Sequence, residues 1–397
     1  MNPIKVFNPE HDMALSNGDR HFIAPKNIRE MAHDLAPLLD VMNSEQFIVW
    51  GWDHALKTRL LRMGIAADML PTDTALTALR TCSERKTAHQ LLTAFRSNHP
   101  DDPYTGESII AQNIDEIATY ATLHGHIILK DPLSSSGKGL RHVNMNEGGL
   151  PLPPSQRGGT EGMSSLSSSL SKVENWANAL IKRYGYLTAE PYYEKKQDFA
   201  MEFCIRDGKC YFIGYSLFNT NHHGRYESNL LMTDEKIEGQ LAQYIPHSTL
   251  HEVQAWVISH SDLIIPTEWN TTKLPLYFGI DMMIVKTANN RLQTEENSEF
   301  ALHPCVEINL RLNMGIVSHE AHQKLLAPKV EGTFHVTSFP SEEAAQQFYK
   351  EHTEQYPTIY QGKRLFSGYF PLTPIYPHTR HHAYIIAQPI SSKESFI

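Results

Sequence analysis

The sequence is poor in the features that mark secreted and membrane proteins. It has 4 cysteines in 397 residues, none of them in a Cys-x-x-Cys pair, so we expect reduced core thiols and neither a disulfide framework nor a cysteine metal site. No apolar run approaches the ~18 residues of a membrane-spanning helix. The first residues also lack the basic and then long apolar pattern of a secretory signal. These absences predict a cytoplasmic protein with no membrane partner.

The sequence also lacks long runs of like charge. The 35 basic and 44 acidic residues give a net charge of −9, and neither sign forms a block of five or more. Such a protein would repel a phosphate backbone, so nucleic acid is not expected as a partner. Histidine is abundant, with 22 residues, but the run His319-Glu320-Ala321-His322 lacks the spacer of a zincin helix. No zinc site is predicted.

The beginning of the chain has the pattern of a small α/β domain. Short apolar runs at residues 4–7 and 46–50 indicate strands, and apolar residues between Ile28 and Leu39 recur at helical spacing. A further helix is expected after Asp53, which suits the N-cap position. We therefore predict an α/β domain over residues 1–82 with a largely parallel sheet.

A second pattern starts at Ser83 and predicts an α+β domain over residues 83–330. Two strand hairpins are expected in it, one turned at Asp207-Gly208 and one that pairs Gly279–Lys286 with Cys305–Leu310. Residues 144–172 are rich in serine, glycine and proline, with too few large apolar groups to offset their ordering entropy, so we expect a mobile insertion there. Strand-like runs around proline-rich turns over 331–397 predict a C-terminal cap.

The first chemical signal is a lysine at the end of an apolar strand, followed by a loop of serine and glycine. The strand ends at Lys130, and the loop is Ser135-Ser136-Gly137-Lys138-Gly139. A fixed cation and several backbone N–H groups suit the oxygens of a triphosphate. The loop is not a Walker A loop, because Pro132 stands where that motif has glycine, and Gly139 where it has serine or threonine. A solvated hairpin turn is the alternative interpretation.

The second signal lies on the later hairpin. Side chains alternate along a strand, so Glu307 and Asn309 share one face while Val306 and Ile308 bury in the other. With Asp281 on the facing strand, they form a cluster of oxygen ligands suited to Mg²⁺ or Mn²⁺ bound to phosphates, where water and phosphate complete the coordination. A solvated polar face is the alternative.

Taken in order, these features resemble the ATP-grasp superfamily over about residues 83–319. Beyond Lys130, the loop and the metal ligands, Thr188-Ala189-Glu190-Pro191-Tyr192-Tyr193 is similar to the strand that holds adenine in that family, and Asp198 stands where an acidic residue contacts ribose. The resemblance implies an ATP-grasp fold of class α/β and α+β, with an N-terminal α/β pre-ATP-grasp domain, two α+β lobes that hold ATP between antiparallel sheets, and a C-terminal extension.

The sequence departs from the family at Gly279, because many ligases have an arginine two positions before the metal aspartate. A phosphate-binding arginine must then come from elsewhere, and the guanidinium groups of Arg225 and Arg311 are the candidates, since they match phosphate and carboxylate geometry. A surface loop arginine is the alternative for Arg225. The run Asn8–Asp12 follows the first strand, where open α/β sheets place a ligand crevice, although a helix cap would explain it equally.

The resemblance implies ATP- and Mg²⁺-dependent ligation of a carboxylate to an amine through an acyl phosphate. A kinase-like transfer that stops at phosphorylation, and a non-catalytic ATP-binding regulator, are the alternatives. The expected partners are small-molecule or peptide carboxylates and amines. Their identity and the oligomeric state are not encoded in any recognisable motif.

Overall fold

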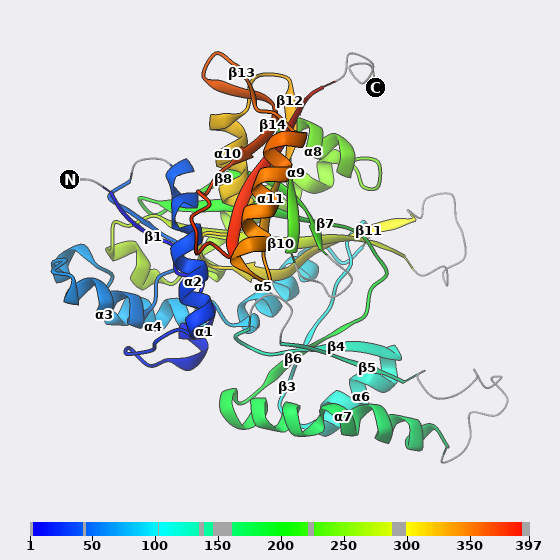
Figure 1. The fold of residues 1–397 in the computed structure, drawn as a ribbon. Helices are drawn as coiled ribbons and strands as arrows, with labels where there is room; N and C mark the ends of the chain where they lie inside the picture. The colour runs from blue at the N-terminus through cyan, green and yellow to red at the C-terminus, as the bar shows by residue number, and fades with distance from the viewer. Residues whose placement is uncertain are drawn as a thin grey trace.

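The structure is a computed structural model that describes residues 3–42, 45–101, 103–134, 139–145, 161–220, 226–287 and 299–390. Figure 1 shows a large body and, below it, a smaller lobe that contains β3 to β6 and two helices. In the part of the chain described, no helix is both long and apolar enough to cross a membrane. All four cysteines are free; Cys204 and Cys305 are buried, as expected of core thiols, whereas Cys82 and Cys210 are only partly buried.

The N-terminal elements form the side of the body that is coloured blue in Figure 1. In chain order they are β1 (Ile4–Val6), α1 (His11–Asn17), α2 (Lys26–Leu35), a 3-10 helix (Ala36–Val41), β2 (Phe47–Val49), α3 (His54–Arg62), a 3-10 turn (Ala67–Met69) and α4 (Asp73–Cys82). Strands β1 and β2 pair in parallel, which confirms the predicted arrangement. Asp53 caps α3, because its carboxylate accepts from Leu56 N at 2.8 Å.

The small lobe is an antiparallel sheet with two helices packed on it. Its strands lie in the order β3-β6-β4-β5, and it contains β3 (Ile109–Ala111), α6 (Ile114–His124), β4 (His126–Lys130), β5 (Leu140–Asn144), α7 (Glu161–Tyr184) and β6 (Leu187–Pro191). Leu129, Val143, Ala177 and their neighbours form a core of its own beneath the sheet. The lobe is therefore a separately packed unit.

One prediction for this lobe is wrong in part. We expected a mobile insertion over 144–172, but β5 ends at Asn144 and α7 already begins at Glu161. Leu170, at the edge of the insertion, is buried in the core of the lobe. Repeated serines do not prevent a helix when apolar residues at helical spacing can pack on a sheet. Residues 146–160 lie outside the described part of the chain.

The body is built on one nine-stranded sheet in the order β11-β10-β7-β8-β9-β12-β15-β14-β13. The strands are β7 (Lys195–Arg206), β8 (Lys209–Thr220), β9 (Tyr226–Leu231), β10 (Leu276–Lys286), β11 (Phe300–Asn309), β12 (Val330–Ser338), β13 (Ile359–Gln361), β14 (Arg364–Pro371) and β15 (His381–Pro389). Both predicted hairpin pairings are present. Asp207 and Gly208 turn the first one with φ values of 51° and 71°.

Helices cover the body sheet, and the last part of the chain extends it. The helices are α5 (Arg85–Asn98), α8 (Asp234–Leu241), α9 (His247–Ser259), α10 (Met314–Leu325) and α11 (Glu342–Gln355), with 3-10 turns at Ser261–Leu263 and Thr267–Thr271. The expected C-terminal cap over 331–397 is instead continuous with the sheet, because β12 pairs with β9 on one side and β15 on the other.

The N-terminal unit does not have a core of its own. Phe47, Leu56 and Leu76 pack in one cluster with residues of β7 and β10, whereas Phe7 and Leu39 pack in a second cluster with residues of α10 and β15. A two-stranded sheet is too small to bury its apolar side chains alone. The predicted boundary at residue 82 is therefore a change of pattern in the sequence and not a gap between two cores.

Candidate ATP and metal site

Lys130 lies at the end of β4, on the side of the small lobe that faces the body. Its side chain is buried, and Nζ is 2.5 Å from Glu190 Oε1 on the neighbouring strand β6. The same Nζ donates to the main-chain oxygen of Val306 on β11, at 3.2 Å. A cation from one lobe is thus held against the strand of the other lobe that carries the predicted metal ligands.

The predicted phosphate loop follows Lys130, and only its two ends are described. Asp131 N donates to Gly139 O at 2.9 Å, which closes the base of the loop. Ser134 Oγ is buried and has no hydrogen-bond partner among the residues that the structure describes. Ser135, Ser136, Gly137 and Lys138 lie outside the described residues. A buried hydroxyl at the base of the loop is suited to an oxyanion.

The three predicted metal ligands come together on β10 and β11. Asp281 and Glu307 are directly paired in the antiparallel register, and Asn309 is paired with Gly279. Asn309 Nδ2 therefore reaches diagonally across the ladder to Asp281 Oδ2, at 3.2 Å. The alternation along β11 is confirmed for Ile308, which is buried, but Val306 is only partly buried, since this strand faces a hollow under α5.

The electrostatics of this pair suit a divalent cation. Burial and the facing Glu307 carboxylate raise the pKa of Asp281 to about 7. Within the described ranges, no three His, Cys, Asp or Glu side chains gather as a metal cluster. The set consists of two carboxylates and the amide of Asn309, whose nitrogen faces Asp281 here and whose oxygen would have to turn toward a bound ion. That set fits Mg²⁺, which takes few protein ligands and keeps water and phosphate as the rest. Both carboxylates would then be neutralised.

Two arginines flank the carboxylates. Arg311 forms a bidentate pair with Asp12 of α1, from Nε to Oδ1 at 3.1 Å and from Nη2 to Oδ2 at 3.0 Å, and Nη2 also donates to Asn309 Oδ1 at 3.2 Å. Arg85, at the start of α5, donates from Nη2 to Glu307 Oε1 at 3.1 Å and from Nε to Asp131 O, also at 3.1 Å. Arg85 therefore links the metal strand to the base of the phosphate loop.

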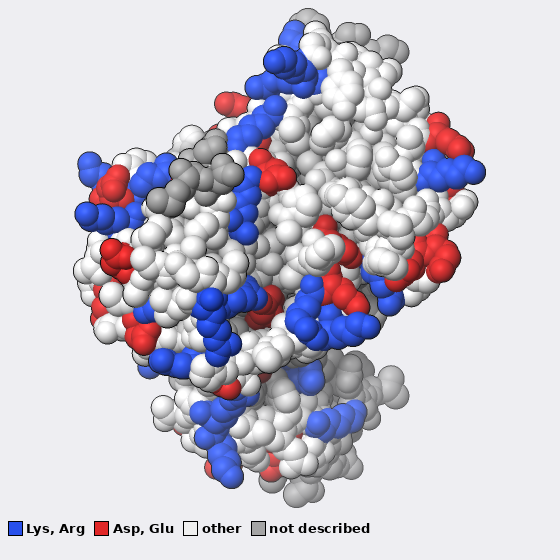
Figure 2. Space-filling model, turned by 60° about the vertical axis from the view of Figure 1, so that its left-hand side comes forward, with Lys and Arg blue, Asp and Glu red and all other residues white. Residues whose placement is uncertain are grey.

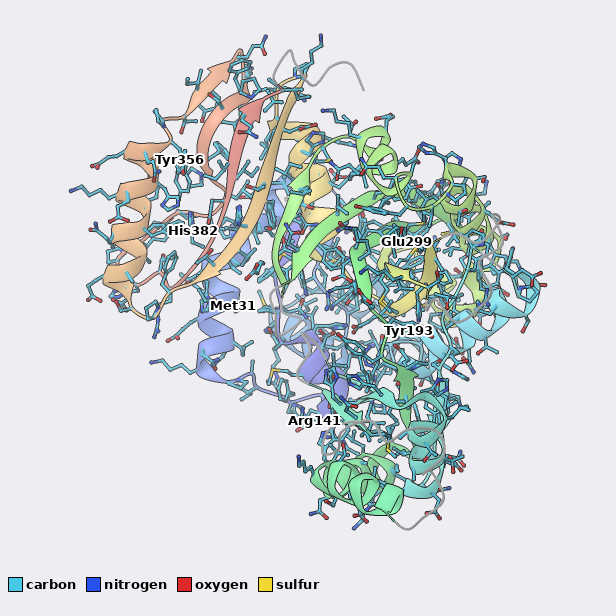
Figure 3. The ribbon with its side chains drawn as sticks, turned by 90° about the vertical axis from the view of Figure 1, so that its right-hand side faces the viewer. Met31, Arg141, Tyr193, Glu299, Tyr356 and His382 are labelled. Atoms are coloured by element: carbon cyan, nitrogen blue, oxygen red, sulfur yellow. The ribbon has the colours of Figure 1, made fainter. Side chains whose placement is uncertain are left out.

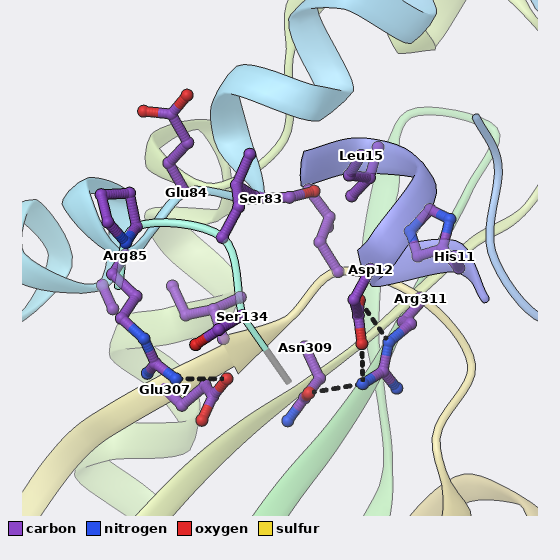
Figure 4. A pocket seen from close by; sticks show the side chains of 15 residues that line it. His11, Asp12, Leu15, Ser83, Glu84, Arg85, Ser134, Glu307, Asn309 and Arg311 are labelled. Carbon is purple, nitrogen blue, oxygen red and sulfur yellow. Dashed lines mark hydrogen bonds and ion pairs between the residues drawn. The ribbon is translucent and has the colours of Figure 1, made fainter. Parts of the chain in front are cut away.

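Arg85, Glu307, Asn309 and Arg311 line one open pocket between α1, α5 and β11, with about 480 Å³ of space including the solvent at its mouth. Figure 4 shows Arg85 and Arg311 entering it from opposite sides. Its lining includes His11, Asp12, Glu84, Ser134 and Leu310. Figure 2 shows acidic and basic side chains together along the hollow between the body and the small lobe.

Glycine at position 279 is explained by the side chains of Asn313 and Glu202. A Cβ on Gly279 would lie 2.3 Å from Asn313 Nδ2 and 2.4 Å from Glu202 Oε2, and one on Gly315 would lie 2.0 Å from Glu202 Oε1. Glu202 is fully buried and accepts from Asn313 Nδ2 at 2.7 Å. An arginine at position 279 would therefore clash with this group, so the departure from the family pattern has a structural cause.

The residues predicted to contact adenine and ribose do not come together as closely as the predicted metal ligands do. Glu190 pairs with Lys130, as described above, whereas Tyr192 is 51% exposed and stacks on His126 at 4.3 Å. Tyr193 lies where the chain passes from the small lobe to the body (Figure 3), and its hydroxyl accepts from Glu107 N at 3.1 Å. Asp198 forms an ion pair with Lys195. Arg225 lies outside the described residues.

Comparison with known proteins gives no relative at the level of sequence. No family model matches the chain, and no curated protein matches it. Two antiparallel sheets meet where Lys130 of the small lobe bonds to the main-chain oxygen of Val306 in the body. The chain resembles the ATP-grasp superfamily.

The chain is similar to solved structures of several enzymes. An N5-carboxyaminoimidazole synthetase from Staphylococcus aureus, complexed with ADP, is 11% identical with a TM-score of 0.46, over 99% of this chain and 95% of that one. A biotin carboxylase from Campylobacter jejuni is 10% identical with a TM-score of 0.47, over 92% and 75%. An L-amino acid ligase from Bacillus licheniformis is 14% identical with a TM-score of 0.43, over 92% and 82%. At these values the likeness does not extend to substrates.

Sequence reasoning missed Arg85 and Glu202, and it left the role of Asp12 open. Arg85 stands three residues before Ala88 and seven before Leu92, on the apolar face of α5. A charged residue on an otherwise apolar helix face was therefore a usable signal. The pairing of Asp12 with Arg311 joins residues 299 positions apart, and no local pattern could have indicated it.

Proposed function

We propose that this protein is an ATP- and Mg²⁺-dependent ligase that joins a carboxylate to an amine through an acyl phosphate. The observation that carries the proposal is the position of Lys130, whose Nζ bonds to the carbonyl of Val306, directly before Glu307. A phosphate-binding cation and a metal-binding carboxylate are thus adjacent, although they come from different lobes. An intracellular location, where ATP is present, forms part of the proposal.

The side chains have distinct roles in it. Lys130 and the N–H groups of the loop closed by Gly139 bind the phosphates of ATP. Asp281, Glu307 and Asn309 would hold Mg²⁺, which neutralises charge on the phosphate oxygens when bound. Glu190 to Tyr193 and Asp198 line the place proposed for the nucleoside. Arg85 is added to these, because it contacts both Glu307 and the base of the phosphate loop.

The reaction itself needs positioning and charge neutralisation more than covalent help from the protein. A substrate carboxylate oxygen attacks the γ-phosphorus of ATP, a P–O bond forms, and the bond to ADP breaks. The amine then attacks the acyl carbon, inorganic phosphate leaves, and the amine loses a proton. Arg311 is proposed to stabilise the anionic acyl phosphate, and Asp12 holds its guanidinium in a fixed orientation by two hydrogen bonds.

The test is incubation with ATP, Mg²⁺ and a cell metabolite extract, with products followed by mass spectrometry. A ligase yields ADP, phosphate and a product whose mass is that of acid plus amine minus water. Hydroxylamine should divert the acyl phosphate to a hydroxamate. Glu307→Gln should abolish turnover while the fold is kept, and Ile308→Val, a matched change of the next residue on the buried face, should leave turnover nearly unchanged.

Two other outcomes are defined by the same experiment. A phosphorylated product without hydroxamate would identify a kinase-like phosphotransferase. Saturable ATP binding without any turnover would identify a non-catalytic regulator, an alternative favoured by Gly279 in place of the family arginine. Either outcome would refute the ligase proposal.

A further inference from the structure

A second hollow lies on the other side of α1 from the site described above. It has a volume of about 350 Å³ and is formed by Glu10 and Ala14 at α1, residues 20–24, Arg29 of α2, and α3. Figure 1 shows these helices, in blue, on one side of the body. The segments that follow β1 and β2 both reach it, at Glu10 and Asp53. It therefore lies at the carboxyl edge of the parallel strand pair, where open α/β sheets bind ligands.

The lining of this hollow is strongly basic for a chain whose net charge is −9. Four arginines come from three separate segments: Arg20, Arg29, Arg59 and Arg62. Only two carboxylates line the hollow, those of Glu10 and Asp53. Asp53 is 3% exposed and is directed inward. Its Oδ1 accepts from Leu56 N as the cap of α3, and its Oδ2 lies 3.2 Å from His11 Nδ1. It therefore does little to neutralise the arginines.

The arginines are also incompletely paired. Arg62 Nη2 lies 3.0 Å from His21 Nδ1, so the partner of this guanidinium is an imidazole and not a carboxylate. Arg29 forms no ion pair within the described part of the chain. Arg20 bonds to Asp73, which is shared with Lys57. Positive charge thus stays unbalanced around the hollow, and guanidinium groups match the geometry of phosphates and carboxylates.

We propose that this hollow binds a small anion with at least two negative charges, a phosphate ester or a polycarboxylate. The proposal stands apart from the ligase reaction, because it uses none of the residues assigned to ATP, Mg²⁺ or the acyl phosphate. Glu10 is the group that the anion must compete with. Glu10 Oε1 pairs with Arg59 Nη1 at 3.2 Å, and Oε2 is buried without a hydrogen-bond partner in the described ranges.

Because Glu10 competes with the anion, two kinds of substitution should change the anion affinity in opposite directions. Removal of a lining arginine should weaken binding, whereas neutralisation of Glu10 should strengthen it, because Arg59 is released and a repulsive charge is lost. Lys5 provides a matched control: it is a cation of the same N-terminal unit, paired with Asp40 at 2.6 Å, and it lies outside the hollow. Lys130→Ala reports on binding at the proposed ATP site.

The experiment is calorimetric titration of the full chain, in Mg²⁺-free buffer of low ionic strength, with inorganic phosphate and with tricarballylate. Binding should be saturable for at least one probe, and the tighter probe distinguishes the phosphate from the polycarboxylate class. Arg62→Ala should weaken it about 10-fold or more, as expected for one charge-assisted contact. Glu10→Gln should tighten it, and Lys5→Ala should leave it unchanged. Absence of binding, loss in Lys130→Ala, or indifference to Arg62→Ala and Glu10→Gln would each overturn the proposal.

Discussion

Glu202→Gln should change the pH dependence of stability without disturbing the packing. The carboxyl group of Glu202 lies between Gly279 and Gly315, is 1% exposed, and has the amide of Asn313 as a hydrogen-bond donor. Burial raises its pKa from 4.5 to about 8, against a smaller lowering by Asn313. Glutamine has nearly the same shape, is neutral at every pH, and can still accept from Asn313.

The sign follows from the two pKa values of Glu202. Between pH 4.5 and pH 8 the folded protein binds a proton at this carboxyl more tightly than the unfolded chain does. The resulting stability is complete below pH 4.5 and is lost as the pH rises through about 8. The full difference amounts to at most about 5 kcal/mol. The variant has no such loss, so it should match the wild type near pH 5 and exceed it by a few kcal/mol at pH 9.

The assay is guanidinium denaturation, followed by tryptophan fluorescence, at unit steps from pH 5 to pH 9. The quantity compared is the difference in unfolding free energy between variant and wild type at each pH. Glu331→Gln is the control, because it removes a partly exposed carboxylate that pairs with Lys236 on the protein surface. Parallel pH profiles for Glu202→Gln and the wild type would refute the reasoning.

Three further changes have defined outcomes. Lys130→Ala should weaken ATP binding about 10-fold or more in fluorescence titration. Adding Glu190→Gln should restore thermal stability, because it removes the carboxylate left unpaired, but it should not restore ATP affinity. Recovery of ATP affinity would contradict the phosphate-binding role of Lys130. Ile308→Ala should lower the unfolding free energy by ~2–5 kcal/mol in denaturant titration through a core cavity, and an unchanged midpoint would place Ile308 outside the core. Gly279→Ala should cost ~1–3 kcal/mol by overpacking against Glu202, measured by calorimetry, and it should be milder in a Glu202→Ala background if that carboxylate is the obstacle.

Local patterns in the sequence were sufficient for much of the fold. The hairpin of β7 and β8 follows from alternation and from the Asp207-Gly208 turn, and Asp53 caps α3 as its position suggested. What could not be predicted is the joining of strands far apart in the sequence. Strand β9 pairs with β12, about 100 residues later, and no periodicity in either segment specifies that partner.

The same division holds for the candidate site. The shared face of Glu307 and Asn309 follows from the two-residue period of a strand, and it was predicted. The contacts that complete the pocket are non-local: Arg85 to Glu307 and Arg311 to Asp12 join separate elements. Such contacts depend on how whole elements pack. Gly279 is an example: the reason for a glycine at this position is the close approach of the Glu202 side chain, which the sequence alone does not reveal.

The sharing of one core by both ends of the chain constrains how the protein is made. Phe7 and Leu39 belong to one cluster with Leu312, Ile316 and Ile385, so these two side chains cannot complete their packing until the last strands have left the ribosome. At roughly 5–20 residues per second, that interval lasts tens of seconds. We therefore expect the nascent N-terminal segment to need a chaperone or a transient non-native partner during translation, whereas the small lobe, with its local core, can fold as it emerges.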